Sequence, residues 1–253
     1  MDRCPSGIET LDTLLQGGFP KSTAIGLIGD VGSGKTTLCN QIVWNSLQRG
    51  ANVLYYCVDE SVDDVLLNME QFEWEVKPFV EKGTLHFVDV FSRGMGFISD
   101  TMYASDTVDS VEPDQVSEIS FNFREMILEG KKYVFNYLTG TDLLVIYDSF
   151  SPLFMAMARA KVLRFLQYAK YASRVSKAVG IATLDTGVHG EQIENACQQQ
   201  ADGVIELKKG IQDGHTSRFL RVVKMARTRV SEEYYPLELT DHGLIVHRIA
   251  MSF

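Results

Sequence analysis

The stretch Gly29-Asp30-Val31-Gly32-Ser33-Gly34-Lys35-Thr36 decides the fold of this chain. It fits G-x-x-x-x-G-K-[ST], the phosphate-binding P-loop, and it lies between an expected buried strand at 23–28 and an expected helix at 37–48. The glycines let the backbone turn so that successive N–H groups surround a phosphate, and the start of the helix attracts the same anion. A turn that binds nothing would give no reason for Lys35 and Thr36 at the start of a helix.

The motif assigns a role to each of its residues. We expect Lys35 to reach the β- and γ-phosphates of a nucleotide and the Thr36 hydroxyl to bind Mg²⁺. The expected nucleotide-binding residues are Gly29, Asp30, Val31, Gly32, Ser33, Gly34, Lys35, Thr36 and Thr37.

The composition bounds the class of protein. The 253 residues are 45% hydrophobic and 23% charged, which is ordinary for a globular chain that buries a core. The formal net charge of −9 argues against a surface that holds nucleic acid non-specifically, because such surfaces cluster Lys and Arg. The four cysteines form no C-x-x-C pair, and the sequence has no signal-peptide core and no membrane-spanning run. We therefore expect a cytoplasmic protein with buried, reduced thiols.

Strand-like and helix-like segments alternate along most of the chain. The expected strands lie at 52–58, 85–90, 143–147 and 180–184, and the expected helices at 61–72, 115–138 and 151–179. This alternation predicts an α/β fold with a mostly parallel central sheet flanked by helices. Short C-terminal strands joined by turns should extend the sheet as antiparallel hairpins; they are expected at 202–207, 218–224, 235–239 and 244–247. We expect one domain over 1–253, with an irregular acidic excursion at about 92–114.

Three carboxylates are the expected chemical partners of the P-loop. Asp148 ends the apolar run 143–147, which we expect to lie beside the P-loop strand, so that Asp148 holds Mg²⁺ through water. Asp59 and Glu60 end another strand, and the carboxyl ends of parallel strands surround the ligand crevice. Hydrolysis needs a carboxylate that orients or deprotonates water, for which Glu60 is the first choice and Asp59 the second. The alternatives are helix capping for Asp148 and stabilisation of a helix start for the acidic pair.

The order of these motifs is similar to that of single-domain KaiC-like ATPases of the RecA superfamily, a kind frequent in archaea. The resemblance runs nearly end to end, through 6–12, 17–20, the P-loop, 59–60, 68–72, 76–78, 201–207 and 224–247. It implies a RecA-like P-loop NTPase core that binds ATP or ADP with Mg²⁺. It also implies a homo-oligomer, usually a hexameric ring, with ATP held between subunits.

The chain departs from that family at the catalytic residues. The acidic pair falls on Asp59 and Glu60, and the first position is usually Glu, so Glu60 should carry more of the chemistry. Relatives typically read K-M-R-G-T at 224, and its Lys and Arg reach the γ-phosphate held by the neighbouring subunit. Lys224 matches, but Ala226 stands at the Arg position and Arg227 follows it. Arg227 can act only if a bulge or turn re-aims it.

These departures bear on the rate. An arginine supplied by a neighbour can raise turnover by ~10³–10⁵, so hydrolysis here is expected to be slow. A third departure is Asp185, at a position where relatives often carry a Gln that senses the γ-phosphate. We expect Asp185 either to contact water bound to Mg²⁺ or to point away.

Three functions fit these observations. The first is a Mg²⁺-dependent ATPase that converts ATP to ADP and phosphate and whose nucleotide state controls assembly or the binding of a protein partner. The second, favoured by Asp59 and Ala226, is a nucleotide-binding regulator or scaffold with incidental turnover. The third is a recombinase-like protein on single-stranded DNA. The expected loop 186–194 disfavours it, because it has two acids and no Lys or Arg.

Overall fold

The computed structural model describes residues 2–92, 126–129, 131–133, 142–212 and 215–248. Most of the expected excursion at 92–114 and of the expected helix at 115–138 lies outside these residues. The strands of the main sheet are β3 (Thr23–Gly29), β4 (Asn52–Cys57), β5 (Leu85–Asp89), β6 (Leu143–Asp148), β7 (Val179–Asp185), β8 (Gly203–Gln212), β9 (His215–Met225), β10 (Tyr235–Thr240) and β11 (Gly243–Val246). Two short strands, β1 (Arg3–Cys4) and β2 (Phe19–Pro20), pair separately.

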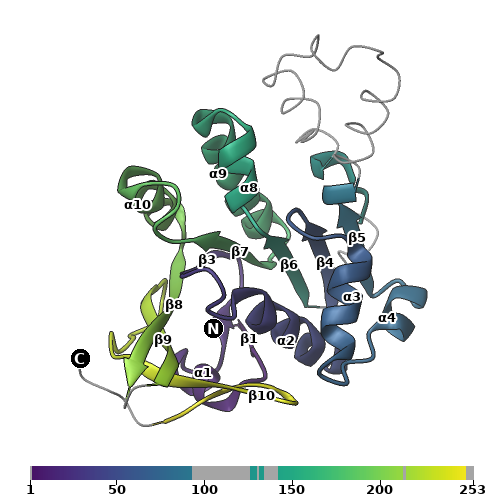
Figure 1. Cartoon of the computed structure of the whole chain (residues 1–253). Coiled ribbons are helices and arrows are strands. Elements are labelled where there is room, and N and C mark those ends of the chain that lie inside the picture. The colour runs from purple at the N-terminus through teal and green to yellow at the C-terminus, as the bar shows by residue number, and fades with distance from the viewer. Residues whose placement is uncertain (1, 93–125, 130, 134–141, 213–214, 249–253) are drawn as a thin grey trace, which may run out of the picture.

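The main sheet is parallel over most of its width. Among the described residues its order is β11-β10-β9-β8-β3-β7-β6-β4-β5. Figure 1 labels the strands from β10 to β5. The strands from β8 to β5 are mutually parallel, and β9, β10 and β11 are added antiparallel. The first of the expected C-terminal strands therefore pairs parallel with β3 before it forms a hairpin with β9.

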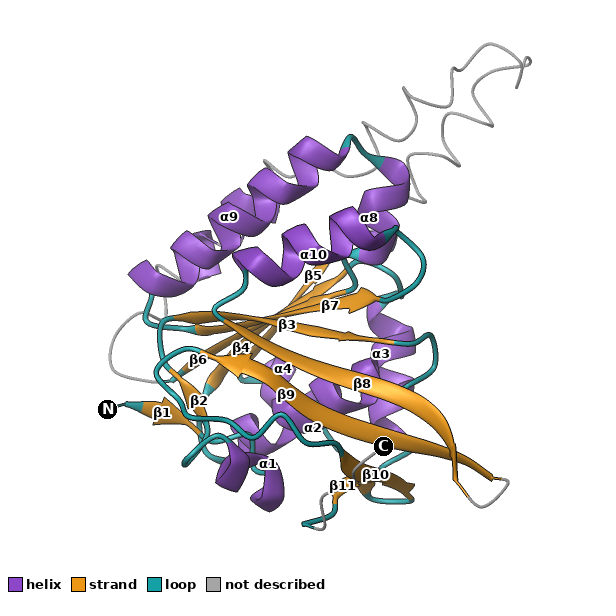
Figure 2. Cartoon of the chain, turned by 90° about the vertical axis from the view of Figure 1, so that its left-hand side faces the viewer, coloured by secondary structure: helices purple, strands orange, loops and turns teal. Residues whose placement is uncertain are grey.

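Helices cover both faces of the sheet. The helices whose two ends lie in the described residues are α1 (Glu9–Leu14), α2 (Lys35–Gln48), α3 (Val62–Glu70), α4 (Lys77–Glu81), α8 (Ser151–Ala156), α9 (Arg159–Val175) and α10 (Glu191–Gln200). Figure 2 shows α8, α9 and α10 on one side of the sheet and α1 and α2 on the other. None of the described helices is long and apolar enough to cross a membrane.

The alternation of side chains along the strands explains the two layers. In β4, Val53 and Tyr55 join the core under α2, whereas Leu54 and Tyr56 join the core under α9. Because both faces are covered, the strand reads as a continuous apolar run.

Several expected boundaries were wrong. The expected helix 151–179 is two helices, because Met157 is extended between α8 and α9, and α9 ends at Val175. β7 begins one residue earlier than expected and includes Asp185. The strand expected at 202–207 is too short, since β8 continues to Gln212. The expected loop 186–194 is shorter, because α10 begins at Glu191.

Candidate nucleotide site

The P-loop joins the carboxyl end of β3 to the first turn of α2, and two of its glycines are sterically required. Gly34 precedes α2 with φ 102°, a conformation that favours glycine. A Cβ on Gly29 would lie 2.0 Å from the carbonyl oxygen of Leu207 in β8. The loop can therefore take this shape only with glycine at both positions.

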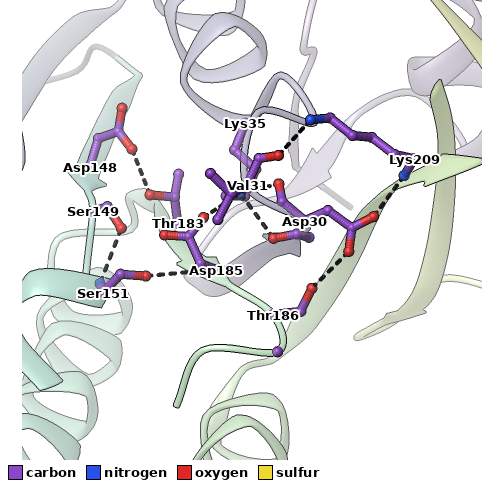
Figure 3. A network of polar contacts seen from close by, with 12 residues as sticks. Asp30, Val31, Lys35, Asp148, Ser149, Ser151, Thr183, Asp185, Thr186 and Lys209 are labelled. Carbon is purple, nitrogen blue, oxygen red and sulfur yellow. Dashed lines mark hydrogen bonds and ion pairs between the residues drawn. The ribbon is translucent and has the colours of Figure 1, made fainter. Parts of the chain in front are cut away.

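Lys35 lies at the centre of the site. Its buried ammonium group lies 2.7 Å from Asp185 Oδ1 and donates to the carbonyl oxygens of Gly29 at 3.0 Å and Asp30 at 2.9 Å (Figure 3). The expectation that Asp185 points away is therefore wrong. The carboxylate comes from the end of β7, which pairs with β3 so that Asp185 stands opposite Gly29.

A second network holds the outer side of the P-loop. The Asp30 carboxylate accepts hydrogen bonds from the backbone N–H of Lys209 at 2.8 Å and from the Thr186 hydroxyl at 3.4 Å. The Lys209 ammonium group in turn donates to the Val31 carbonyl oxygen at 2.7 Å (Figure 3). Asp30 and Lys209 thus tie the loop to β8.

Asp148 is buried at the end of β6 and points toward the P-loop side of the sheet. It accepts a hydrogen bond from the Thr183 hydroxyl at 2.6 Å and lies 3.1 Å from the Tyr55 hydroxyl, and the nearby Thr36 side chain also favours its charged form. Burial raises the pKa of the Asp148 carboxyl, although these hydrogen bonds oppose the shift. Asp148 does not cap α8, whose N-cap is Phe150.

The expectation that the strand ending in Asp148 lies directly beside the P-loop strand was wrong. β7, not β6, pairs with β3, because α8 and α9 return the chain to a position between them. Thr183 of β7 lies between the two strands and donates to Asp148, and the Asp148 carboxylate still lies near the P-loop residue Thr36.

The acidic pair follows β4 and lies beside Asp148. The backbone N–H of Val58 donates to the Asp148 carbonyl oxygen at 2.8 Å, and Asn68 of α3 donates to Glu60 Oε2 at 2.9 Å. Partial burial and the Asp148 carboxylate raise the pKa of both Asp59 and Glu60. Stabilisation of the helix start does not require the pair, because the side chains of Ser61 and Asp64 form a capping box for α3.

The raised pKa predicts how Glu60 affects stability. The folded chain binds the Glu60 proton more tightly than the unfolded chain, so this stabilisation is present below the ordinary pKa of 4.5 and is lost as pH rises through the folded pKa. We expect Glu60→Gln to raise the free energy of unfolding at about pH 7 and to have little effect near pH 4. Urea unfolding across this range measures it, with the exposed Glu81→Gln as control. Parallel curves for wild type and Glu60→Gln would contradict it.

Lys224 and Arg227 are not brought to the P-loop of their own chain. Gly29, at the carboxyl end of β3, pairs with Leu207 in the middle of β8, whereas Met225 pairs with Gly203 at the start of β8. Lys224 donates to the Ala201 carbonyl oxygen at 2.8 Å, and burial together with Lys170 lowers its pKa. These side chains therefore lie at the amino edge of the parallel strands, and the P-loop lies at the carboxyl edge.

The backbone before and at Arg227 contains the bulge and the turn that an arginine one residue after the usual position would need. β9 bulges where Val204 pairs with Lys224 but Ile205 pairs with Val222. Arg227 then takes a left-handed φ of 58°, and its exposed guanidinium donates to the Lys21 carbonyl oxygen at 2.7 Å. The turn re-aims Arg227 along the amino edge, beside the start of β3.

The residues present fit a nucleotide with Mg²⁺. The Ser33 hydroxyl is buried in the P-loop and has no hydrogen-bond partner among the described residues, so it is available to a phosphate oxygen. The Thr36 hydroxyl and the Asp148 carboxylate offer the hard oxygen ligands, direct or through water, that Mg²⁺ prefers.

Four residues of the site were not predicted as site residues. Tyr55 and Thr183 position Asp148, and Lys209 and Thr186 position Asp30. Thr183 could have been found from the sequence, because it is a polar residue in an otherwise apolar strand. The sequence gives no sign that Lys209 faces the P-loop, because that depends on the pairing of β8 with β3.

Known proteins resemble this chain over nearly its whole length. The family model described as "ATPase: KaiC" matches residues 4–250. A UPF0273 protein of Pyrococcus horikoshii is 30% identical over 249 residues, which are 97% of this chain and 94% of the relative. A UPF0273 protein of Methanopyrus kandleri is 30% identical over 252 residues, 97% of this chain and 92% of the relative.

The fold is also similar to a solved one. The crystal structure of a KaiC-like protein from Pyrococcus horikoshii matches with a TM-score of 0.74 at 23% identity, over 97% of this chain and 99% of that one. The predicted α/β fold, with a mostly parallel sheet, flanking helices and C-terminal antiparallel strands, is confirmed.

Proposed function

The chain belongs to the KaiC family of ATPases, as its motifs indicated, and from this premise we propose that it binds ATP with Mg²⁺ and hydrolyses it slowly to ADP and phosphate. We further propose that one RecA-type domain forms a homo-oligomer, a hexameric ring, with the nucleotide between subunits. The observation that carries the proposal is the division of the site. Lys35, Thr36 and Asp148 gather at the carboxyl edge, while Lys224 of the same chain lies at the amino edge.

Each group at the carboxyl edge has a role in this proposal. The P-loop N–H groups and the α2 N-terminus hold the phosphates, and Lys35 contacts the β- and γ-phosphates. Thr36 and Asp148 hold Mg²⁺, which would neutralise charge that develops on the phosphate oxygens.

Glu60 is the proposed general base. A water oxygen attacks the γ-phosphorus while the bond from that phosphorus to the bridging oxygen of ADP breaks. The Glu60 carboxylate takes a proton from the water and later returns it to the phosphate product. The raised pKa of Glu60 makes it a stronger base than an ordinary glutamate.

Mixing inactive variants tests whether the site is shared between subunits. Lys35→Ala removes the P-loop cation, and Lys224→Ala removes the cation proposed to come from the neighbour. Equal amounts of the two variants, dissociated and reassembled together, are expected to regain a fraction of wild-type phosphate release, since some interfaces then combine intact Lys35 with intact Lys224. Each variant alone should stay inactive.

A second mixture is the matched control. Lys35→Ala and Glu60→Gln both damage the carboxyl-edge half, so no interface between them is complete and activity should not return. Rescue in both mixtures, or in neither, would overturn the shared site. A mass measurement in solution with ATP, with ADP and without nucleotide would show the assembly directly.

One observation favours the alternative of a regulator with incidental turnover. Ala226 replaces the usual arginine, and Arg227 donates to the Lys21 carbonyl oxygen of its own chain. If the protein is a regulator, it should bind ATP tightly with almost no phosphate release, and a protein partner should be recovered only with ATP-loaded protein.

A further inference from the structure

We propose that Asp185 is an internal counterion of Lys35 that lowers the affinity for nucleoside triphosphate, because a phosphate oxygen must take the place of its carboxylate. This inference rests on the proposed function, since it concerns ATP binding at the same P-loop. It assigns Asp185 to setting affinity, in place of the roles expected from the sequence.

The hydrogen bonds of Lys35 are the first observation. An ammonium group has three N–H donors, and three oxygens surround this one: Asp185 Oδ1 at 2.7 Å and the carbonyl oxygens of Gly29 and Asp30 (Figure 3). The two carbonyl oxygens belong to the P-loop itself. The carboxylate is the partner from outside the P-loop and the one with a charge, so it is the partner that a phosphate oxygen would replace.

The anchoring of Asp185 is the second observation. Its backbone N–H donates to the Ser151 hydroxyl at 2.9 Å, and the next N–H, of Thr186, donates to the Gly29 carbonyl oxygen at 3.0 Å. The end of β7 is thus fastened to α8 on one side and to the first P-loop glycine on the other. The backbone holds the carboxylate beside Lys35, so contact with Lys35 does not depend on a mobile loop.

The surrounding charge is the third observation. The side chains of Lys35 and Asp185 are 8% and 21% exposed, so water screens their attraction only in part. Asp148 and Asp59 bring further negative charge to the same edge, and Asp185 contributes to the raised pKa of Asp59. A triphosphate therefore has to compete with Asp185 for Lys35 and also to approach its negative charge.

The isosteric variant Asp185→Asn tests this inference. It removes the charge but keeps an oxygen that can accept from Lys35. We expect the dissociation constant of fluorescently labelled ATP with Mg²⁺ to fall by about tenfold, since a charged acceptor holds Lys35 more strongly than a neutral amide oxygen by about that factor. Asp185→Ala should shift affinity in the same direction, and melting curves would confirm that both variants fold.

The control is Asp59→Asn, which removes the same charge from the same edge. No ion pair joins Asp59 to Lys35 in the described part of the chain, so its effect on affinity should be clearly smaller. Equal gains in the two variants would mean that only the general charge matters and would overturn the inference.

The remaining outcomes separate this inference from the proposed function. Wild-type binding of ATP with no gain in Asp185→Asn overturns the inference alone. Weaker binding in Asp185→Asn only when Mg²⁺ is present would make Asp185 a partner of hydrated Mg²⁺ and also overturns it. No ATP binding by wild type or by either Asp185 variant overturns the proposed function. Binding by the variants but not by wild type supports both.

Discussion

Replacing Lys35 with alanine is expected to abolish measurable ATP binding and to lower turnover by about 10²–10³-fold or more. The variant loses the cation proposed to contact the phosphates. It also leaves the Asp185 carboxylate, which lies 2.7 Å from the ammonium group, without its counterion at the mouth of the P-loop. Calorimetric titration with ATP and Mg²⁺, together with a phosphate-release assay, measures both effects.

Lys209→Ala is the matched control for Lys35→Ala. Lys209 of β8 also contacts the P-loop, but its ammonium group donates to the Val31 carbonyl oxygen and does not contact Asp185 in the described part of the chain. Its removal should weaken ATP binding much less, because the Asp30 carboxylate still accepts from the backbone N–H of residue 209. Equal losses in two folded variants would show that loop shape, and not the charge of Lys35, governs binding.

Replacing Glu60 with glutamine is expected to lower kcat by about 10²–10⁴-fold while ATP affinity changes little. Glutamine keeps the acceptor for Asn68 but cannot take a proton from water, so the loss should appear in the chemical step. Single-turnover phosphate release at saturating ATP separates this step from binding.

Asp59→Asn is the companion variant for the second prediction. The Asp59 side chain is shorter and more exposed than that of Glu60, so its replacement should reduce kcat less. A larger loss in Asp59→Asn than in Glu60→Gln would transfer the role of general base to Asp59.

The fold could be predicted from the sequence because its elements are local. The continuous apolar runs of β3, β4 and β6 predict strands that are covered on both faces. Ser61 indicates the start of α3, because its side chain caps that helix. The break at Met157 was missed, because the apolar side chains continue at helical spacing through both α8 and α9. The parallel pairing of β8 with β3 was missed, because the local hydrophobic pattern of a strand does not specify which strand it pairs with.

The candidate site could likewise be predicted only in part. The P-loop, Asp148 and the acidic pair are marked by residue type at the ends of strands. What the sequence leaves open is where a side chain points. Asp185 and Lys209 became part of the site through the register of β7 and β8 against β3, which sets Asp185 opposite Gly29 and carries Lys209 past the loop.

The opposite-edge positions of Lys35 and Lys224 limit the symmetry of the proposed assembly. A contact that joins the carboxyl edge of one subunit to the amino edge of the next is heterologous, so it is repeated head to tail. A two-fold dimer, in which both partners use one patch, would complete no nucleotide site. An open row of subunits always leaves one P-loop without a neighbour, and only closure into a ring supplies the last one. Ring closure thus becomes a condition for every subunit to be active.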